Sequence, residues 1–272
     1  ARIENMMEYI LSLILGLFIG SFINCIVYRV YNNKSFLKGR SICPKCDHEL
    51  GVLDLIPLFS FFSLKGKCRY CKKKISKEYP IVELFTGLLF FGVAYLLNAN
   101  FLTQGIFNLE FLNLLFYFFI AAYFVMIFVF DLKWFIIPDG LTFSAIVITL
   151  IYLFSGTFIL NIFTLDELFI RVVTAFVVFL FFFALYFFSE GKAMGFGDVK
   201  LVIFLGLLLG FPNILPALFI AFASGAIIGL SMMGLKKRGM KSEIPFGPFL
   251  VFGTFVALFF GNYFIQWYLS LM

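Results

Sequence analysis

The chain has 272 residues, of which 62% are hydrophobic, 43 are phenylalanine and only 13% are charged. Soluble domains carry about 25% charged residues, so this composition excludes an ordinary soluble protein and indicates a chain that lives in a bilayer. The net charge of +6 does not indicate a nucleic-acid partner, because the basic residues lie in loops beside hydrophobic runs, as membrane-orientation signals do.

Eight hydrophobic runs follow one another, and each is predicted to form a helix of a membrane domain. The ranges are Tyr9–Tyr28, Pro80–Leu97, Leu112–Phe130, Ile137–Phe154, Leu168–Ser189, Val199–Phe211, Ile214–Leu235 and Phe249–Leu269. The first run leads into a basic loop without a small-residue cleavage site, so we interpret it as a retained helix. The sixth run is short for a span, and we expect it to begin in a broken or re-entrant segment that lines a protein cavity.

The basic residues are unevenly spread along the chain. Twelve of the 21 Lys and Arg lie between Arg29 and Lys77. Four more follow the seventh run, namely Lys236, Lys237, Arg238 and Lys241. Segments 98–111 and 155–167 contain no Lys or Arg. Because loops rich in Lys and Arg stay in the cytosol, we expect the basic loops, Asp131 and the turn at 192–200 on the cytosolic side, with both termini outside.

Four of the five cysteines form two Cys-x-x-Cys pairs inside the first basic loop. Cys43 and Cys46 are separated by 21 residues from Cys68 and Cys71, close to the spacing that closes a tetrahedral zinc site. Four protein ligands leave no position for water, so the predicted zinc is structural. The remaining Cys25 is interpreted as a packing residue, and His48 as a surface residue.

The predicted fold class is an all-α polytopic membrane protein of about eight transmembrane helices, with a small cytosolic zinc-ribbon insert between helices 1 and 2. The expected division is a first transmembrane helix at 1–28, the zinc ribbon at 29–79 and a membrane-embedded catalytic domain at 80–272.

His48 is the only histidine, and this limits the chemistry available. A His-Glu-x-x-His metalloprotease needs two histidines on one helix, and an intramembrane serine protease needs a histidine base, so neither can be assembled. Carboxylates remain for acid–base chemistry, and ionisable groups within a membrane are functional candidates by default. The candidates are Glu83, Asp131, Asp139, Glu190 and Asp198.

Asp131 and Asp198 are the strongest pair among these carboxylates. Asp198 follows Gly195-Phe196-Gly197, where two glycines allow the backbone to bend and to approach another chain closely. Asp131 closes the third run at the same predicted depth, so the two carboxyl groups can meet and share one proton near neutral pH. One would then activate a water while the protonated one polarises the scissile carbonyl.

Structural roles compete with this interpretation. Asp131 could pair with Lys133, and Asp198 could be a helix N-cap or pair with Lys200. Asp139 follows a proline at a helix start, where a first-turn acid is ordinary.

Two carboxylates complete the set. Glu190 is interpreted as solvated, and Glu83 as either a cap or a buried functional group. Glu83, Asp139 and Lys200 are kept as possible supporting residues.

These motifs together resemble the bacterial type IV prepilin peptidase family, also called leader peptidase/N-methyltransferase. The residues that carry the resemblance are Gly20–Asn24 with Arg29, the two cysteine pairs, Tyr79–Glu83, Asp131, Ile137–Asp139, Gly195–Lys200 and Ile244–Pro248. The resemblance implies that Asp131 and Asp198 are the catalytic pair of an intramembrane aspartyl peptidase of the inner membrane. It also implies cleavage of the basic leader of prepilins or pseudopilins after a glycine at the cytosolic face, and methylation of the new N-terminus by S-adenosylmethionine.

No glycine-rich nucleotide-binding loop is evident, so the methyl donor's residues are not predicted. A basic leader beside a basic loop is not attracted by simple electrostatics. We therefore expect anionic lipid headgroups, or local acids such as Asp47, Glu49 and Asp54, to receive it.

Two other classes of protein compete with this interpretation. A transporter could use paired intramembrane acids to relay protons or bind cations, but the interrupted helices that many transporters show in corresponding halves are missing. A membrane scaffold that docks partners through a zinc ribbon would need no acids near Gly195–Asp198.

Overall fold

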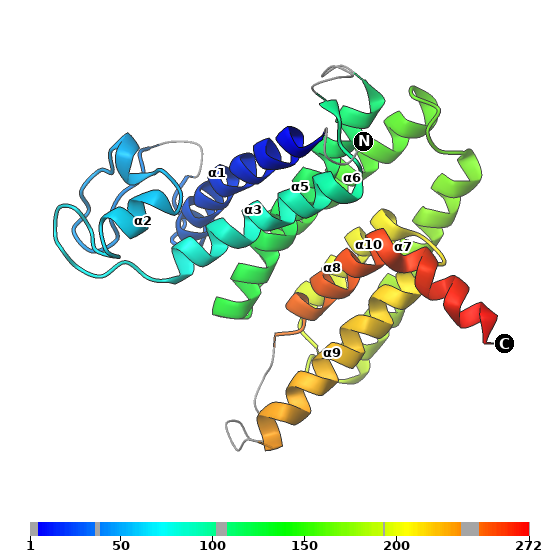
Figure 1. Ribbon diagram of the computed structural model, residues 1–272. Coiled ribbons are helices and arrows are strands. Elements are labelled where there is room, and N and C mark those ends of the chain that lie inside the picture. The colour runs from blue at the N-terminus through cyan, green and yellow to red at the C-terminus, as the bar shows by residue number, and fades with distance from the viewer. Residues whose placement is uncertain (1–4, 36–38, 102–107, 193, 235–244, 272) are drawn as a thin grey trace. The chain divides into compact units, whose positions relative to one another are not determined.

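The computed structural model describes residues 5–35, 39–101, 108–192, 194–234 and 245–271, and these residues are mainly helical (Figure 1). The helices are α1 (Met6–Tyr31), α2 (Phe59–Ser63), α3 (Glu78–Leu96), α5 (Leu109–Trp134), α6 (Asp139–Phe158), α7 (Leu165–Phe188), α8 (Phe196–Leu209), α9 (Ile214–Gly234) and α10 (Gly247–Ser270), with a 3-10 helix, η1, at Val52–Asp54. Within these ranges the structure contains no strand, only two isolated antiparallel bridges, Ile42 with Glu49 and Lys67 with Lys74. The all-helical prediction is confirmed.

Every one of the eight predicted helices has a counterpart in the structure. Among the described residues, seven helices are long and apolar enough to cross a membrane. The other predicted helix, α8, has 14 residues, which at 1.5 Å per residue is about 21 Å against a hydrocarbon thickness of about 30 Å. The short sixth run is therefore a short helix. The basic residues predicted after the seventh run, Lys236, Lys237, Arg238 and Lys241, lie outside the described part of the chain.

The chain divides into two compact units, residues 1–126 and 127–272, and the division falls within α5. Each unit has its own packing. The division expected from the sequence, into a first helix, a zinc ribbon and a catalytic domain with boundaries after residues 28 and 79, stays a prediction.

In the first unit, α1 and α3 run antiparallel and pack closely through small residues. A Cβ on Gly16 would lie 2.8 Å from the Gly87 Cα, and one on Gly20 would lie 2.7 Å from the Glu83 Cα. Such contacts let helix backbones approach in a membrane, where association depends on van der Waals packing. The glycines of α1 are therefore packing residues.

Hydrogen bonds tie the insert between α1 and α3 to these two helices. The Arg29 guanidinium donates to the Gly39 and Arg40 carbonyls at 2.9 and 2.8 Å. The Leu58 backbone N–H donates to the Glu83 carboxylate at 2.8 Å. The insert is thus anchored at its beginning by α1 and in its middle by α3.

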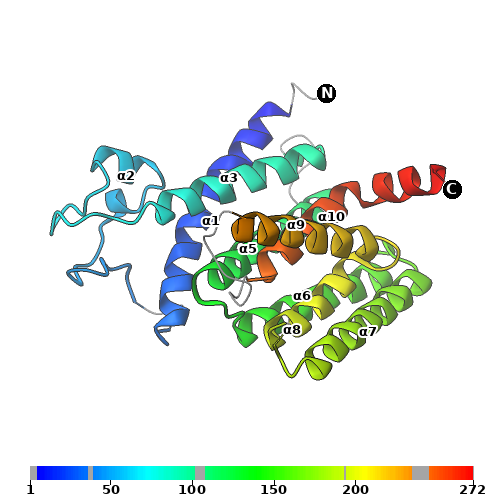
Figure 2. The same cartoon turned by 90° about the horizontal axis from the view of Figure 1, so that it is seen from below.

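In the second unit, α8 lies beside α6 and α7, and most of its side chains are buried (Figure 2). Its close contact with α7 needs a glycine, because a Cβ on Gly206 would lie 2.5 Å from the Ala175 Cα. Side chains that are apolar all round the helix, as here, are typical of a helix enclosed by others.

Arg171 of α7 caps the far end of α8. Its guanidinium donates to the carbonyl of Leu207 at 3.3 Å and to that of Leu208, and it lies 5.3 Å from the Phe163 ring centroid. The last carbonyls of any helix lack partners within the helix. Arg171 therefore satisfies groups that a short helix would otherwise leave in an apolar environment.

Candidate active site and metal centre

Asp131 lies in the last turn of α5, and its side chain is buried. Its Oδ2 accepts a hydrogen bond of 2.8 Å from the backbone N–H of Gly247, the first residue of α10. The carboxyl group is thus oriented by a backbone group 116 residues further along the chain.

Asp198 is also buried, and it lies in the first turn of α8. The N-cap residue of that helix is Gly195, so Asp198 is not itself the N-cap. Its carboxyl group lies close enough to that of Asp131 for the two to interact electrostatically. The structure therefore brings the two predicted acids together.

Ile137 fills the space between the backbone that carries Asp198 and the backbone that orients Asp131. A Cβ on Gly197 would lie 3.2 Å from the Ile137 Cβ, and one on Gly247 would lie 3.4 Å from its Cδ1. Gly195 differs, because its Cβ would meet only Asp198 Oδ2, at an ordinary 3.7 Å. The close backbone approach expected at the two glycines is therefore found at Gly197. The backbone of Gly195 is extended, with φ −73° and ψ 148°, a conformation that any residue can adopt.

The four predicted cysteine ligands form one cluster. The sulfur atoms of Cys43, Cys46, Cys68 and Cys71 all lie within 4.8 Å of one another. The two knuckles have the same local backbone. The N–H of Cys43 donates to the His48 carbonyl at 3.0 Å, and the N–H of Cys68 donates to the Lys73 carbonyl at 2.9 Å. The residue before each of these carbonyls has a left-handed backbone, with φ 55° at Asp47 and 59° at Lys72.

The thiols of the cluster ionise unequally. A hydrogen bond from the Lys73 backbone, joined by bonds from the neighbouring thiols, lowers the pKa of Cys71 to about 7. A hydrogen bond from the His48 backbone works to lower the pKa of the Cys46 thiol, but burial and the neighbouring thiols outweigh it and raise that pKa to about 11. The His48 ring lies against the Tyr70 ring at a tilt of 37°, with centroids 3.6 Å apart, and His48 is outside the four-sulfur cluster.

Comparison with known proteins gives two family matches. Residues 14–97 match the bacterial peptidase A24 N-terminal domain, and residues 118–230 match the type IV leader peptidase family. The prepilin leader peptidase/N-methyltransferase of Aeromonas salmonicida (strain A449) is 33% identical over 232 residues, which is 85% of this chain and 75% of that protein. The chain belongs to the type IV leader peptidase family.

Other relatives have the same name. The protein of Aeromonas hydrophila is 32% identical over 85% of this chain and 75% of its own length, and that of Pectobacterium carotovorum subsp. carotovorum is 30% identical over 78% and 71%. No solved structure matches the chain. The resemblance inferred from the motifs is confirmed, the chain is a multi-pass membrane peptidase by family, and the transporter alternative is not favoured.

The three residues considered as supporting have different surroundings. Asp139 begins α6 and forms an ion pair with Lys200 of α8, whose Nζ also lies 5.0 Å from the Phe196 ring centroid. Lys200 therefore pairs with Asp139 and links α6 to α8. Glu83 is buried in the first unit, where its carboxylate accepts a hydrogen bond from the Leu58 N–H.

Two residues near the aspartates had no predicted individual role. Ile137 and Gly247 lie in motifs that carried the family resemblance, yet nothing in their own chemistry indicates that they orient an acid. A glycine next to a proline, as in Gly247-Pro248, indicates only a turn or a helix start.

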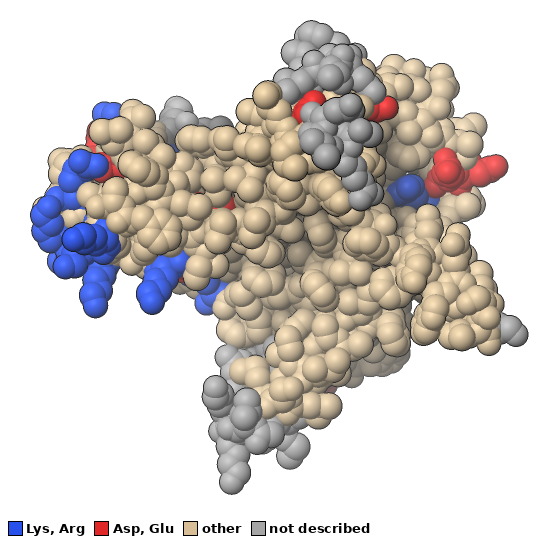
Figure 3. All heavy atoms as spheres, in the orientation of Figure 1, with Lys and Arg blue, Asp and Glu red and all other residues tan. Residues whose placement is uncertain are grey.

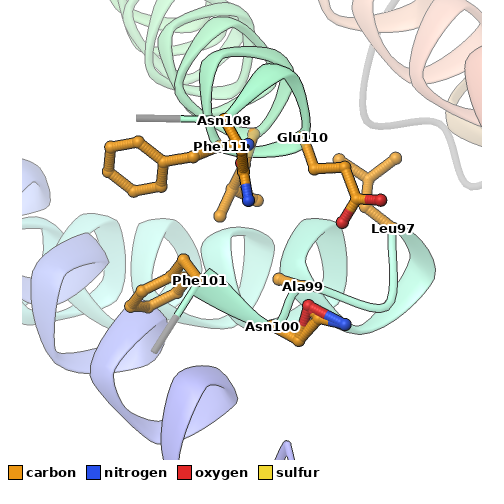
Figure 4. Close-up of a pocket in the computed structure, with 8 residues that line it drawn as sticks. Leu97, Ala99, Asn100, Phe101, Asn108, Glu110 and Phe111 are labelled. Carbon is orange, nitrogen blue, oxygen red and sulfur yellow. Dashed lines mark hydrogen bonds between the residues drawn. The ribbon is translucent and has the colours of Figure 1, made fainter. Parts of the chain in front are cut away.

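The described part of the chain indicates no site for a methyl donor. The described residues contain no strand, so a glycine-rich loop after a strand is absent from them. The small cavity in Figure 4, about 20 Å³, lies between the residues after α3 and the start of α5. It has room for about one water molecule and is too small for an organic cofactor.

Proposed function

We propose that this leader peptidase cleaves type IV prepilins or pseudopilins with Asp131 and Asp198 as its catalytic pair. The observation that carries the proposal is that two buried carboxyl groups, from the end of α5 and the start of α8, lie close enough to interact electrostatically. Two neighbouring carboxyl groups cannot both ionise easily, so they share a proton. The titration belongs to the pair, and no separate role is assigned to either acid.

The chemistry follows from that shared proton. The ionised carboxylate takes a proton from a water molecule, and the protonated one donates a hydrogen bond to the scissile carbonyl. Water adds across the peptide bond, giving the leader a carboxylate and the remaining prepilin a free amine. Gly247 fixes one acid through its N–H, and Ile137 excludes bulk water between the two helix ends.

The orientation of the chain supports cleavage at the cytosolic face of the inner membrane. The lysine-rich insert is expected in the cytosol by the positive-inside rule. Of the acids expected to receive the basic leader, Glu49 and Asp54 are already paired with Arg40 and Arg69, at 3.1 and 2.7 Å. Anionic lipid headgroups are therefore the better acceptors for the leader.

Zinc fits the cysteine cluster as a structural ion. Zinc–sulfur bonds of about 2.3 Å in a tetrahedron place the sulfurs about 3.8 Å apart, within the span that the four atoms already have. When bound, the ion would hold the two knuckles together. The name of the relatives, which includes N-methyltransferase, supports a second activity, methylation of the new N-terminus. The methyl donor that the family resemblance implies is S-adenosylmethionine.

The test uses purified protein and a synthetic prepilin, with and without S-adenosylmethionine, read by mass spectrometry. Asp131→Asn and Asp198→Asn should each abolish cleavage while expression stays normal. Glu190→Gln is the matched control, because that exposed acid pairs only with the neighbouring Lys192 among the contacts described. Wild-type cleavage by either aspartate variant would disprove the assignment. A mass increase of one methyl group on the cleaved product, only with the methyl donor present, would establish the second activity.

A further inference from the structure

The insert between α1 and α3 exposes large apolar side chains that its own packing does not explain. Val52 and Leu53 of η1 are 79% and 64% exposed, and Phe59 and Phe62 of α2 are 65% and 70% exposed. We call these four residues the apolar tip. The two short elements contact each other. Clustered exposed apolar side chains on a polar module indicate an interaction surface.

The surroundings of the apolar tip are strongly basic. Residues 32–77 contain eleven Lys and Arg against three acids. Figure 3 shows Lys and Arg gathered over the insert. Two of the three acids are neutralised by the arginine pairs already described, and the described lysines of the insert are exposed. A partner for this surface must offer both apolar groups and negative charge.

The fold fixes the apolar tip close to the end of a membrane span. α2 begins one residue after Leu58, whose N–H is bound by Glu83 in the second turn of α3. Leu58 has a left-handed backbone, φ 59°, which is unfavourable for a leucine and so has to be held by its surroundings. The hydrogen bond from a buried carboxylate supplies such a restraint, and it keeps α2 beside the helix that enters the bilayer.

We propose that the apolar tip inserts into the interfacial layer of a bilayer rich in anionic lipids, while the lysines around it bind headgroup phosphates. A phospholipid surface offers both features that the basic apolar surface requires. A basic prepilin leader lacks the negative charge and would be repelled. The proposal depends only on the membrane location of α1 and α3 and is independent of the peptidase assignment.

Tryptophan fluorescence in nanodiscs tests the proposal on the full chain. Trp134 and Trp267 are replaced by Phe, and a single Trp is then placed at Phe59 or Phe62. The matched control places it at Phe61, which is half-buried and whose ring lies over Gly66 inside the insert, with Cζ 3.2 Å from a Cβ built there. Phospholipids brominated near the headgroup act as the quencher, in phosphatidylglycerol or in phosphatidylcholine discs.

Trp at 59 and 62 should be quenched at least twofold more than Trp at 61 in phosphatidylglycerol, and less in phosphatidylcholine. Equal quenching at all three positions, or none, would overturn the proposal. So would shielding from water at 59 and 62 without lipid quenching, because the occupant would then be protein.

A second measurement needs no substitution. In the wild-type chain, Lys65 and Lys67 should react at least twofold more slowly with an amine-reactive reagent in phosphatidylglycerol discs than in phosphatidylcholine discs. Equal rates would contradict the lipid contact.

Discussion

Replacing Gly247 with alanine tests whether the Gly247 N–H orients Asp131. A Cβ at this position would lie 2.6 Å from Asp131 Oδ2, the atom that accepts the 2.8 Å hydrogen bond, and 3.4 Å from Ile137 Cδ1. Gly247 is the first residue of α10 and does not have a left-handed backbone, so alanine is compatible with its conformation. The substitution therefore acts through the displaced carboxylate.

The expected magnitude follows from the hydrogen bond that is lost. A hydrogen bond to a charged group contributes about 1.5–3 kcal/mol, and about 1.4 kcal/mol corresponds to a factor of ten in rate. We expect cleavage by Gly247→Ala to fall by about ten- to a hundredfold. Gly197→Ala should have a smaller effect, because its Cβ would lie 3.2 Å from the Ile137 Cβ, a contact that a shift of a few tenths of an ångström relieves, and it would not displace a carboxylate.

The assay is the kcat of prepilin cleavage in detergent or nanodiscs, with expression and thermal stability measured in parallel. Gly140→Ala is the matched control, since nothing lies within 4 Å of its Cβ position in α6. That variant should cleave at the wild-type rate. If Gly247→Ala did so too, with normal expression, the Gly247 hydrogen bond would have no role in orienting the catalytic acid.

Three further predictions concern the metal centre, the cap of α8 and the insert. Cys43→Ser/Cys46→Ser should remove about one zinc per chain by metal analysis, and an absence of zinc from wild-type protein purified without chelator would exclude the site. Arg171→Ala should lower the Tm by leaving the last carbonyls of α8 unsatisfied, at a cost of about 1–3 kcal/mol; Arg171→Lys should recover part of the Tm, and an unchanged Tm in both would refute the cap. Burial works to raise the pKa of Asp54, but hydrogen bonds from Arg69, Gly51 and Tyr70 outweigh it, and the pKa lies below its usual value. Its stabilisation is therefore present above the ordinary carboxyl pKa and is lost as the pH falls through the lowered one. At pH 7, Asp54→Asn should make the insert more sensitive to trypsin, whereas Asp47→Asn, at an exposed position where Asn tolerates the left-handed backbone, should not.

The features that depend on local composition and spacing could be predicted from the order of residues. A run of about 20 apolar residues must be helical in a bilayer, because only a helix satisfies its backbone hydrogen bonds internally. Each predicted helix therefore has its counterpart among α1, α3 and α5–α10. The two cysteine pairs could also be predicted, because each knuckle consists of four consecutive residues and the spacing of its two ligands can be read directly from the sequence.

Which distant groups meet depends on how the helices and the insert pack. Gly247 has no side chain that could indicate a partner. The hydrogen bond from its N–H to Asp131 depends on how α5 and α10 pack. Lys200 was as compatible with Asp198, two residues away, as with Asp139, and the packing of α6 against α8 selected Asp139. From the sequence, Glu83 could be a cap or an active-site acid. In the folded chain its carboxylate accepts a hydrogen bond from the Leu58 N–H of the insert. Hydrogen bonds and ion pairs act over a few ångströms, so their partners are fixed by packing between segments that the order of residues does not specify.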